Sequence, residues 1–397
     1  MWLTEQKEFS EESIIASAQF LYLISDTMVV IGNLEKDRRT TKMVEFINYY
    51  IPVLLDHYNR WIFDEKGIFQ VRGWGCKQGG TYVPTGMNHY QFITKKINRE
   101  LGDKFSPGYC NSVTDTDMWI FAGVCNLLAS HKKDQHLFKI PETDFRKLNI
   151  YLRKGVELIK SRISHKQLRN FEGKMVIGAN FDLGAWDDHP DFAYSGYYSD
   201  EFPGRSTKLN SYRKRGVGWD LSHARRFVNI FGTLVGNKNL LNYDFYGTDL
   251  LKELANQLVY GTFNRNEKKP LFTNFMDGTN GWYRVGYSGR KGFGHGPGDM
   301  SIAVLTGGYG FWTDYNRDLE IVMCEMIKML YSTEDEIRRH VKDHYETYYW
   351  QNYRRVEHFS FNNADDPETN SFLICILPSL GKMACNDNQS VHFFNIQ

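Results

Sequence analysis

Apolar residues recur with helical spacing over most of the chain, and strand-like alternation is scarce. Apolar positions three and four residues apart lie on one face of a helix, so each such window predicts an amphipathic helix. The pattern therefore predicts an all-α protein. The predicted helices span residues 13–32, 41–64, 87–101, 115–131, 142–163, 220–236, 248–263, 299–306, 316–331 and 333–349.

The connections between these helices show no point at which the chain divides. No Ser- or Pro-rich linker and no repeat occurs, so residues 1–397 are interpreted as one domain. About ten to twelve helices in one domain fit an α/α toroid, a barrel of helix hairpins around a groove; an irregular helix bundle is the alternative. Three long segments rich in Gly and aromatic residues are predicted to be loops that surround one site at one end of the toroid. They span residues 73–87, 179–218 and 278–299.

Composition narrows the classes of partner. The formal net charge of +1 provides no global field for a polyanion, so no nucleic-acid partner is expected. The 24 Tyr, 27 Phe and 9 Trp suit stacking on sugars, although aromatic residues also fill cores.

Two further features bear on the compartment. The apolar stretch 14–34 contains Asp26 and follows acidic residues, so it is expected to be neither a signal peptide nor a membrane span. The chain is then either cytosolic or a mature exported protein. The six cysteines lie far apart without a CxxC pair, which favours buried free thiols over a disulfide scaffold or a zinc site.

Two aspartates open the helix predicted at residue 115. In the segment 113–119 (VTDTDMW), Thr114 or Asp115 can cap the first turn, but capping does not explain a second Asp at 117. This segment resembles the (α/α)6 glycoside hydrolases of the family 8 type, whose signature places two aspartates before an apolar helix. The resemblance implies that Asp115 and Asp117 line a sugar-binding cleft.

Two further segments resemble the same family. Residues 218–226 (GWDLSHARR) lie where that family has a helix start whose Asp is the base, which implies this role for Asp220. Residues 186–194 (WDDHPDFAY) lie where it has an Asn-Pro-Ser-Tyr loop. The segment 82–90 departs from the family, because it contains no Glu that could be the general acid. Inverting hydrolysis needs both an acid and a base, so this departure disfavours it.

A different set of side chains occupies these positions. Asn88, His89 and Tyr90 replace the acid segment, and His223 and Arg226 follow Asp220. A later segment adds further Tyr and Arg side chains. The combination of Asn, His, Tyr and Arg resembles the active-site residue types of polysaccharide lyases on α/α toroids, such as the alginate and chondroitin AC lyase types. The later residues are Trp282, Tyr283, Arg284 and Tyr287.

These residue types match the groups that a lyase reaction requires. The proton on C5 of a uronic acid becomes acidic enough to remove only when the neighbouring carboxylate is neutralised by Arg, Asn or His. A His or Tyr base then takes the proton, and a Tyr or His returns one to the leaving oxygen. A phenol needs a nearby cation to lower its pKa, and the adjacency of Tyr283 and Arg284 provides one.

The leading hypothesis is thus a polysaccharide lyase that cleaves a uronate-containing polysaccharide by β-elimination, without a cofactor and without a membrane partner. His223 or His89 is the expected base, Tyr283 or Tyr287 the proton donor, and Asn88 with Arg226 or Arg284 the carboxylate clamp. The alternatives are a family 8 type hydrolase with Asp220 as base and a glycan-binding toroid without catalysis. Structural roles compete at each position: capping for Asp220, packing for His89 and the tyrosines. Further substrate contacts are expected from Tyr90, Asp115, Asp117, Trp119, Trp219 and Trp282.

Overall fold

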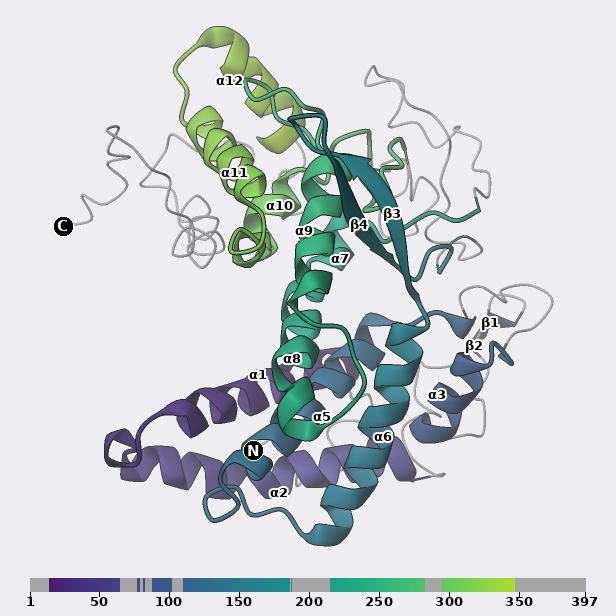
Figure 1. Ribbon diagram of the computed structural model, residues 1–397, viewed down its shortest axis with the longest axis vertical. Helices are drawn as coiled ribbons and strands as arrows, with labels where there is room; N and C mark the ends of the chain where they lie inside the picture. The colour runs from purple at the N-terminus through teal and green to yellow at the C-terminus, as the bar shows by residue number, and fades with distance from the viewer. Residues whose placement is uncertain are drawn as a thin grey trace.

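Helices make up most of the structure (Figure 1). The computed structural model describes residues 14–64, 77–78, 81–82, 88–101, 110–185, 187, 215–282 and 295–346. The α-helices are α1 (Ile14–Asn33), α2 (Thr41–Phe63), α3 (His89–Ile97), α5 (Asp115–Lys133), α6 (Glu142–Lys160), α7 (Leu221–Ala224), α8 (Arg226–Leu241), α9 (Thr248–Gly261), α10 (Ile302–Thr306), α11 (Arg317–Leu330) and α12 (Asp335–Val341). Short helical turns are η1 (Lys36–Arg38), η5 (Tyr309–Trp312) and the π-helix η6 (Lys342–Glu346). The strands are β1 (Lys77–Gln78), β2 (Thr81–Tyr82), β3 (Ile163–Arg169) and β4 (Met175–Phe181).

Each window predicted to be helical contains a helix, and the predominantly helical class is confirmed. The window 220–236 is divided, because Arg225 ends α7 and precedes α8. Polar caps explain where several helices begin. Thr114 accepts a hydrogen bond from the Asp117 amide before α5, and Asn88 accepts one from the Gln91 amide before α3.

Helices α1 and α5 run in the same direction. Asn126 of α5 donates to Asp26 of α1, and Lys133 of α5 donates to Asn33 of α1. Both pairs are 100 residues apart in the chain. A constant offset over two turns means that the two helices are parallel neighbours.

Helix α8 also packs against α5, and α1, α5 and α8 together are called the row below. Arg226 begins α8 and pairs with Asp115 at the start of α5, while Asn237 of α8 contacts Asn126 of α5. The offset is 111 residues at both contacts, so α5 and α8 are also parallel. The N-termini of α5 and α8 therefore lie at the same end of the row.

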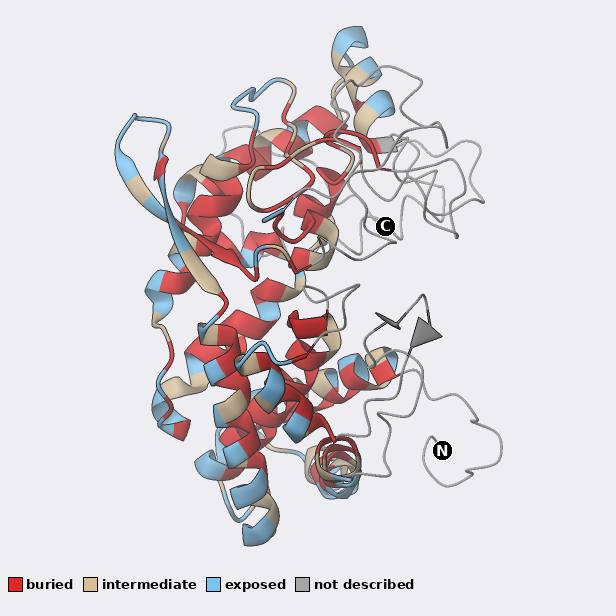
Figure 2. Cartoon of the chain, turned by 90° about the vertical axis from the view of Figure 1, so that its right-hand side faces the viewer, coloured by how far each residue is buried: buried red, intermediate tan, exposed pale blue. Residues whose placement is uncertain are grey.

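The remaining helices form a second layer and an upper part. α2 and α6 contact each other, and each also packs against the row, α2 on α1 and α6 on α5. α9 lies along the hairpin of β3 and β4, and α11 packs against α9 and α12 (Figure 1). The buried apolar residues form one hydrophobic cluster that continues from the row into the upper part, as the red segments of Figure 2 show.

The β3–β4 hairpin is an addition that the sequence pattern did not predict. Its register runs from Ile163 opposite Phe181 to Arg169 opposite Met175. The window predicted to be helical up to residue 163 ends earlier, with α6 at Lys160. The long loop predicted to start at residue 179 begins inside β4, and most of the three predicted loops lies outside the described residues.

Helix α1 is long and apolar enough to cross a membrane, by length and composition alone. In this structure it packs along α5, with Ala18, Leu21 and Met28 buried. Core helices pass the same test, so this helix is weak support for a membrane span.

The cysteines correct one expectation. Cys110 and Cys324 are disulfide-bonded, whereas they were expected to be free thiols. Cys125 is free and buried, as expected. Wide spacing along the chain excludes a compact CxxC motif, but it does not prevent pairing after folding brings distant segments together.

Candidate active site

Asp220 and His223 form a hydrogen-bonded pair at the start of α7. Asp220 is 2% exposed, and its Oδ1 accepts from the Ser222 and His223 amides, each at 3.1 Å. Its Oδ2 lies 2.7 Å from Nδ1 of His223. Asp220 therefore caps the helix and orients the imidazole at the same time.

The imidazole of His223 reaches the surface, whereas the carboxylate behind it does not. The His223 side chain is 22% exposed, against 2% for Asp220. With Nδ1 donating to the carboxylate, the neutral ring carries its lone pair on Nε2. This is the arrangement of a base that is oriented by a buried carboxylate.

Arg226 joins this pair to the first turn of α5. Its Nη2 lies 3.2 Å from Oδ2 of Asp115, and its Nη1 donates to the backbone oxygen of His223 at 3.2 Å. Burial lowers the pKa of Arg226, and Asp115 opposes that shift. The neighbouring Arg225 is exposed, as expected for adjacent residues of a helix. The structure thus brings together Asp115, Asp220, His223 and Arg226 from two segments singled out in the sequence.

Asp117 faces the opposite way from Asp115 and lies in the core. Its Oδ1 is 2.7 Å from Nε2 of His89, and its Oδ2 accepts from Lys96 at 2.5 Å. Tyr151 contacts the other imidazole nitrogen, Nδ1, at 2.9 Å. Burial alone would raise the pKa of Asp117, but Lys96 and His89 outweigh it and hold the pKa below its ordinary value.

This buried network corrects two expectations. His89 was expected to be a base and Asp117 a cleft residue, but both are fully buried. Both nitrogens of the His89 ring are engaged within the protein, and burial lowers the pKa of His89 although Asp117 opposes the shift. A substrate does not reach either side chain in this conformation.

The other expected contacts serve as caps or core. Asn88 caps α3 and donates to the Phe63 oxygen, and the partly buried Tyr90 lies against the Phe63 ring. The three tryptophans are at most 8% exposed: Trp119 packs on Tyr22, Trp219 packs between Phe181 and Phe227, and Trp282 lies against Gly296. The expected catalytic and clamp residues Tyr283, Tyr287 and Arg284 lie outside the described residues.

Asn274 is a supporting residue that the sequence did not point to. It is fully buried, and its amide donates to the oxygens of Gly281 and Gly296 while its own backbone oxygen accepts from the Leu221 amide. It therefore links two ends of the 278–299 segment to α7. An isolated Asn in a Phe-rich segment carries no sequence signal for this role.

Asp182 holds the segment that precedes α5. Its Oδ2 accepts from the Val113 amide at 2.6 Å, just before α5, and its Oδ1 lies 3.7 Å from Arg162. Burial raises the pKa of Asp182 to about 6, against the opposing effects of the Val113 hydrogen bond and Arg162. Arg162 also donates to the backbone oxygens of Lys96 and Asn111. This network fixes the approach to the α5 N-terminus.

The described residues contain no group of three or more His, Cys, Asp or Glu side chains that could hold a metal ion. Comparisons with family models, curated proteins and solved structures find no match to this chain. The interpretation of the site therefore depends on its own geometry.

Proposed function

We propose that this chain is a carbohydrate-active enzyme, a polysaccharide lyase that cleaves a uronate-containing polysaccharide by β-elimination, with His223 as the general base. The observation that carries the proposal is the 2.7 Å contact between His223 Nδ1 and the buried Asp220 carboxylate. A base oriented in this way contributes about 10²–10⁴-fold to proton abstraction.

The accessibility of the two side chains favours His223 over Asp220 as the base. Hydrolysis of the family 8 type would need Asp220 itself to contact a water molecule. Its carboxylate is buried and accepts from the amides of Ser222 and His223 and from the Ser222 hydroxyl. The imidazole, which is partly exposed, is the better placed group.

The elimination balances in atoms and electrons without a cofactor. His223 Nε2 takes the proton from C5, the electron pair forms the C4–C5 double bond, and the C4–O bond breaks. The leaving oxygen receives a proton, for which Tyr283 or Tyr287 is proposed. Arg226 is proposed to bind the uronate carboxylate, which competes with Asp115 for the guanidinium.

The arrangement of the helices supports a toroid as the finer architecture. In an α/α toroid, neighbouring helices of one ring are parallel, because each is joined to the next through a helix of the other ring. The parallel row of α1, α5 and α8, with α2 and α6 packed against it, has this pattern. The proposed site lies where two helices of the row begin.

The disulfide-bonded cysteines favour an exported protein. Disulfides persist in oxidising compartments and are rare in the cytosol. Extracellular or periplasmic polysaccharides would be accessible substrates there.

A paired assay tests the reaction. The protein is incubated with alginate, polygalacturonate, chondroitin, hyaluronan and neutral glucans, and both the far-ultraviolet absorbance of a C4–C5 double bond and new reducing ends are measured. We expect the two signals to rise together on a uronate polymer and on no neutral glucan. Reducing ends without absorbance would establish hydrolysis instead and overturn the proposal.

Variants test the base. His223→Ala should lose at least about 100-fold in rate. His165→Ala is the matched control, because His165 is 41% exposed on β3 and pairs with Glu253 away from the site. If both His223→Ala and His165→Ala keep the rate of the parent protein, His223 is not the base.

A further inference from the structure

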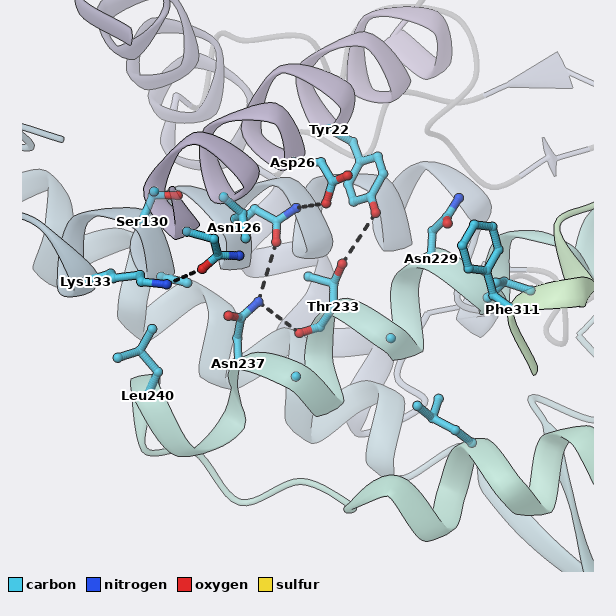
Figure 3. A pocket seen from close by; sticks show the side chains of 18 of the residues that line it. Tyr22, Asp26, Asn126, Ser130, Lys133, Asn229, Thr233, Asn237, Leu240 and Phe311 are labelled. Atoms are coloured by element: carbon cyan, nitrogen blue, oxygen red, sulfur yellow. Dashed lines mark hydrogen bonds between the residues drawn. The ribbon is translucent and has the colours of Figure 1, made fainter. Parts of the chain in front are cut away.

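A cavity of about 710 Å³ lies between the C-terminal halves of α1 and α5 and the length of α8 (Figure 3). None of the proposed active-site residues Asp115, Asp220, His223 and Arg226 lines it. Asn126, at its wall, is eleven residues beyond Asp115 on α5, which corresponds to about 16 Å along the helix axis. Its volume is within the range of about 300–1,000 Å³ that is usual for small-molecule sites.

A chain of polar side chains crosses one wall of this cavity from α1 through α5 to α8. Asp26 accepts from Asn126 at 3.2 Å, and Asn126 accepts from Asn237 at 3.5 Å. Tyr22 and Thr233 approach each other at 3.5 Å across the same wall (Figure 3).

Several atoms of this wall have unused hydrogen-bonding capacity within the described part of the chain. Oδ2 of Asp26 and Oδ1 of Asn237 have no partner there, since their contacts use the other side-chain atoms. The hydroxyl of Ser130 also has none, although Ser130 is only 2% exposed and lines the cavity. Buried polar groups normally find partners, which makes the Ser130 hydroxyl an orphaned group, while the oxygens of the partly buried Asp26 and Asn237 are further acceptors beside it. This wall is suited to a ligand that carries hydroxyl groups.

Two glycines keep the cavity open. Gly232 and Gly236 of α8 both line it, and a Cβ atom added at either would meet nothing within 4 Å. A glycine inside a helix is destabilising relative to alanine, and at these positions no close packing offsets that cost. Side chains of ordinary size here would occupy the space that a ligand needs.

The charges and aromatic residues of the lining narrow the ligand class. Among the described residues, the charged side chains that line the cavity are those of Asp26, Lys133 and Asp314, which form no cationic cluster for an anionic sugar. Phe311, which is 38% exposed, and Tyr315 place aromatic rings at the same cavity. Aromatic surface combined with amide, hydroxyl and carboxylate groups matches the two kinds of surface on a sugar ring.

We infer that this cavity is a second ligand site, which binds a neutral mono- or disaccharide. The inference stands independently of the proposed lyase reaction, because it uses different residues and a different kind of sugar. A saccharide in the cavity would donate hydroxyl groups to Asp26 and Asn237 and lie beside the open face of Gly232.

Calorimetric titration tests the inference with glucose, galactose, mannose, maltose and cellobiose as probes, and with glucosamine and glucuronate as charged comparators. We expect saturable binding of at least one neutral sugar. Gly232→Met, which fills the cavity, should weaken that binding at least tenfold. Gly247→Met is the matched control, since Gly247 has equally open surroundings but does not line the cavity.

A second variant and an activity assay keep the result interpretable. Asn237→Ala should also weaken binding at least tenfold, and it keeps the inference testable if Gly232→Met does not fold. Both variants should retain any activity on uronate polymers, whereas His223→Ala should lose that activity and keep the sugar binding. No saturable binding of any neutral sugar, tighter binding of either charged comparator, or binding that survives in folded Gly232→Met and Asn237→Ala would each overturn the inference.

Discussion

At the scale of single residues, Asp117 is a carboxylate held in a fully buried network. It accepts from Lys96 and His89 with all three side chains buried, and it also completes the capping box of α5. Removing one charge from a buried pair leaves its partner without compensation, which costs about 3–5 kcal/mol. We therefore expect Asp117→Asn to lower the free energy of unfolding by about this amount in urea titrations.

An exposed ion pair provides the control for this experiment. Arg146 and Glu142 of α6 are also paired, but their side chains are 72% and 64% exposed. Such pairs contribute at most about 0.5 kcal/mol. Glu142→Gln should change stability by no more than that. Equal effects of the two substitutions would mean that the buried network around Asp117 does not stabilise the fold.

His89 makes stability depend on pH. Burial lowers its pKa in the folded protein, whereas the unfolded chain titrates near the ordinary value of 6.5. Unfolding then takes up a proton below about pH 6.5, so the free energy of unfolding falls as the pH is lowered through this window. One such proton contributes up to about 1.4 kcal/mol per pH unit.

The His89 effect can be isolated by substitution. His89→Gln should flatten the pH dependence of unfolding between pH 6.5 and 5, whatever its effect on absolute stability. His136→Gln, at an exposed position between α5 and α6, should leave the dependence as in the parent protein. Denaturant titrations across this pH range measure both slopes, and a parent-like slope in His89→Gln would refute the assignment.

At the scale of elements, the helices were predictable and the hairpin was not. Apolar spacing identifies α5 and α11 directly, because the pattern belongs to the residues of one helix. β3 carries exposed polar residues such as His165 and Lys166, and its pairing with β4 comes from backbone groups. No alternation of side chains reveals such pairing, so the sequence extended the preceding helix instead.

Some helical glycines are closely packed and others face open space, and Gly→Ala substitutions distinguish the two kinds. A Cβ at Gly155 of α6 would collide with the Phe121 ring, and one at Gly123 of α5 would collide with the Tyr58 hydroxyl. A Cβ at Gly236 of α8 would meet nothing within 4 Å. Overpacking costs about 1–3 kcal/mol, whereas an unhindered Gly→Ala change in a helix gains about 0.5–1 kcal/mol.

The same Gly→Ala substitution should therefore change the melting temperature in opposite directions at the two kinds of position. Gly123→Ala and Gly155→Ala are expected to lower the melting temperature, and Gly236→Ala to raise it, although alanine has the higher helix propensity in all three cases. A uniform rise in all three variants would show that the helices around Gly123 and Gly155 can separate without cost.

At the scale of the whole molecule, the sequence predicted part of the site because helix starts converge. Asp115 and Arg226 each lie in the first turn of a helix of one parallel row, and they meet there. Asp115 and Asp117 point to opposite sides because residues two apart in a helix do not share a face. The roles of Trp119 and Trp219 could not be predicted, since an aromatic residue suits a core as well as a sugar site, and only the fold buries them.

The disulfide bonds of Cys110 and Cys324 are the remaining feature of this scale. Cys110 lies five residues before the start of α5, and Cys324 lies on α11 in the upper part of the molecule. A disulfide stabilises a fold mainly by restricting the unfolded chain, by about 2–4 kcal/mol. Reduction should therefore lower the thermal midpoint by several degrees, since about 1 kcal/mol corresponds to about 2–4 °C or less in a chain of this size. Thiol titration of the unfolded protein without reductant should find no more than four of the six cysteines reactive. Six reactive thiols, together with a midpoint that reductant does not change, would contradict both the disulfides and the exported location proposed from them.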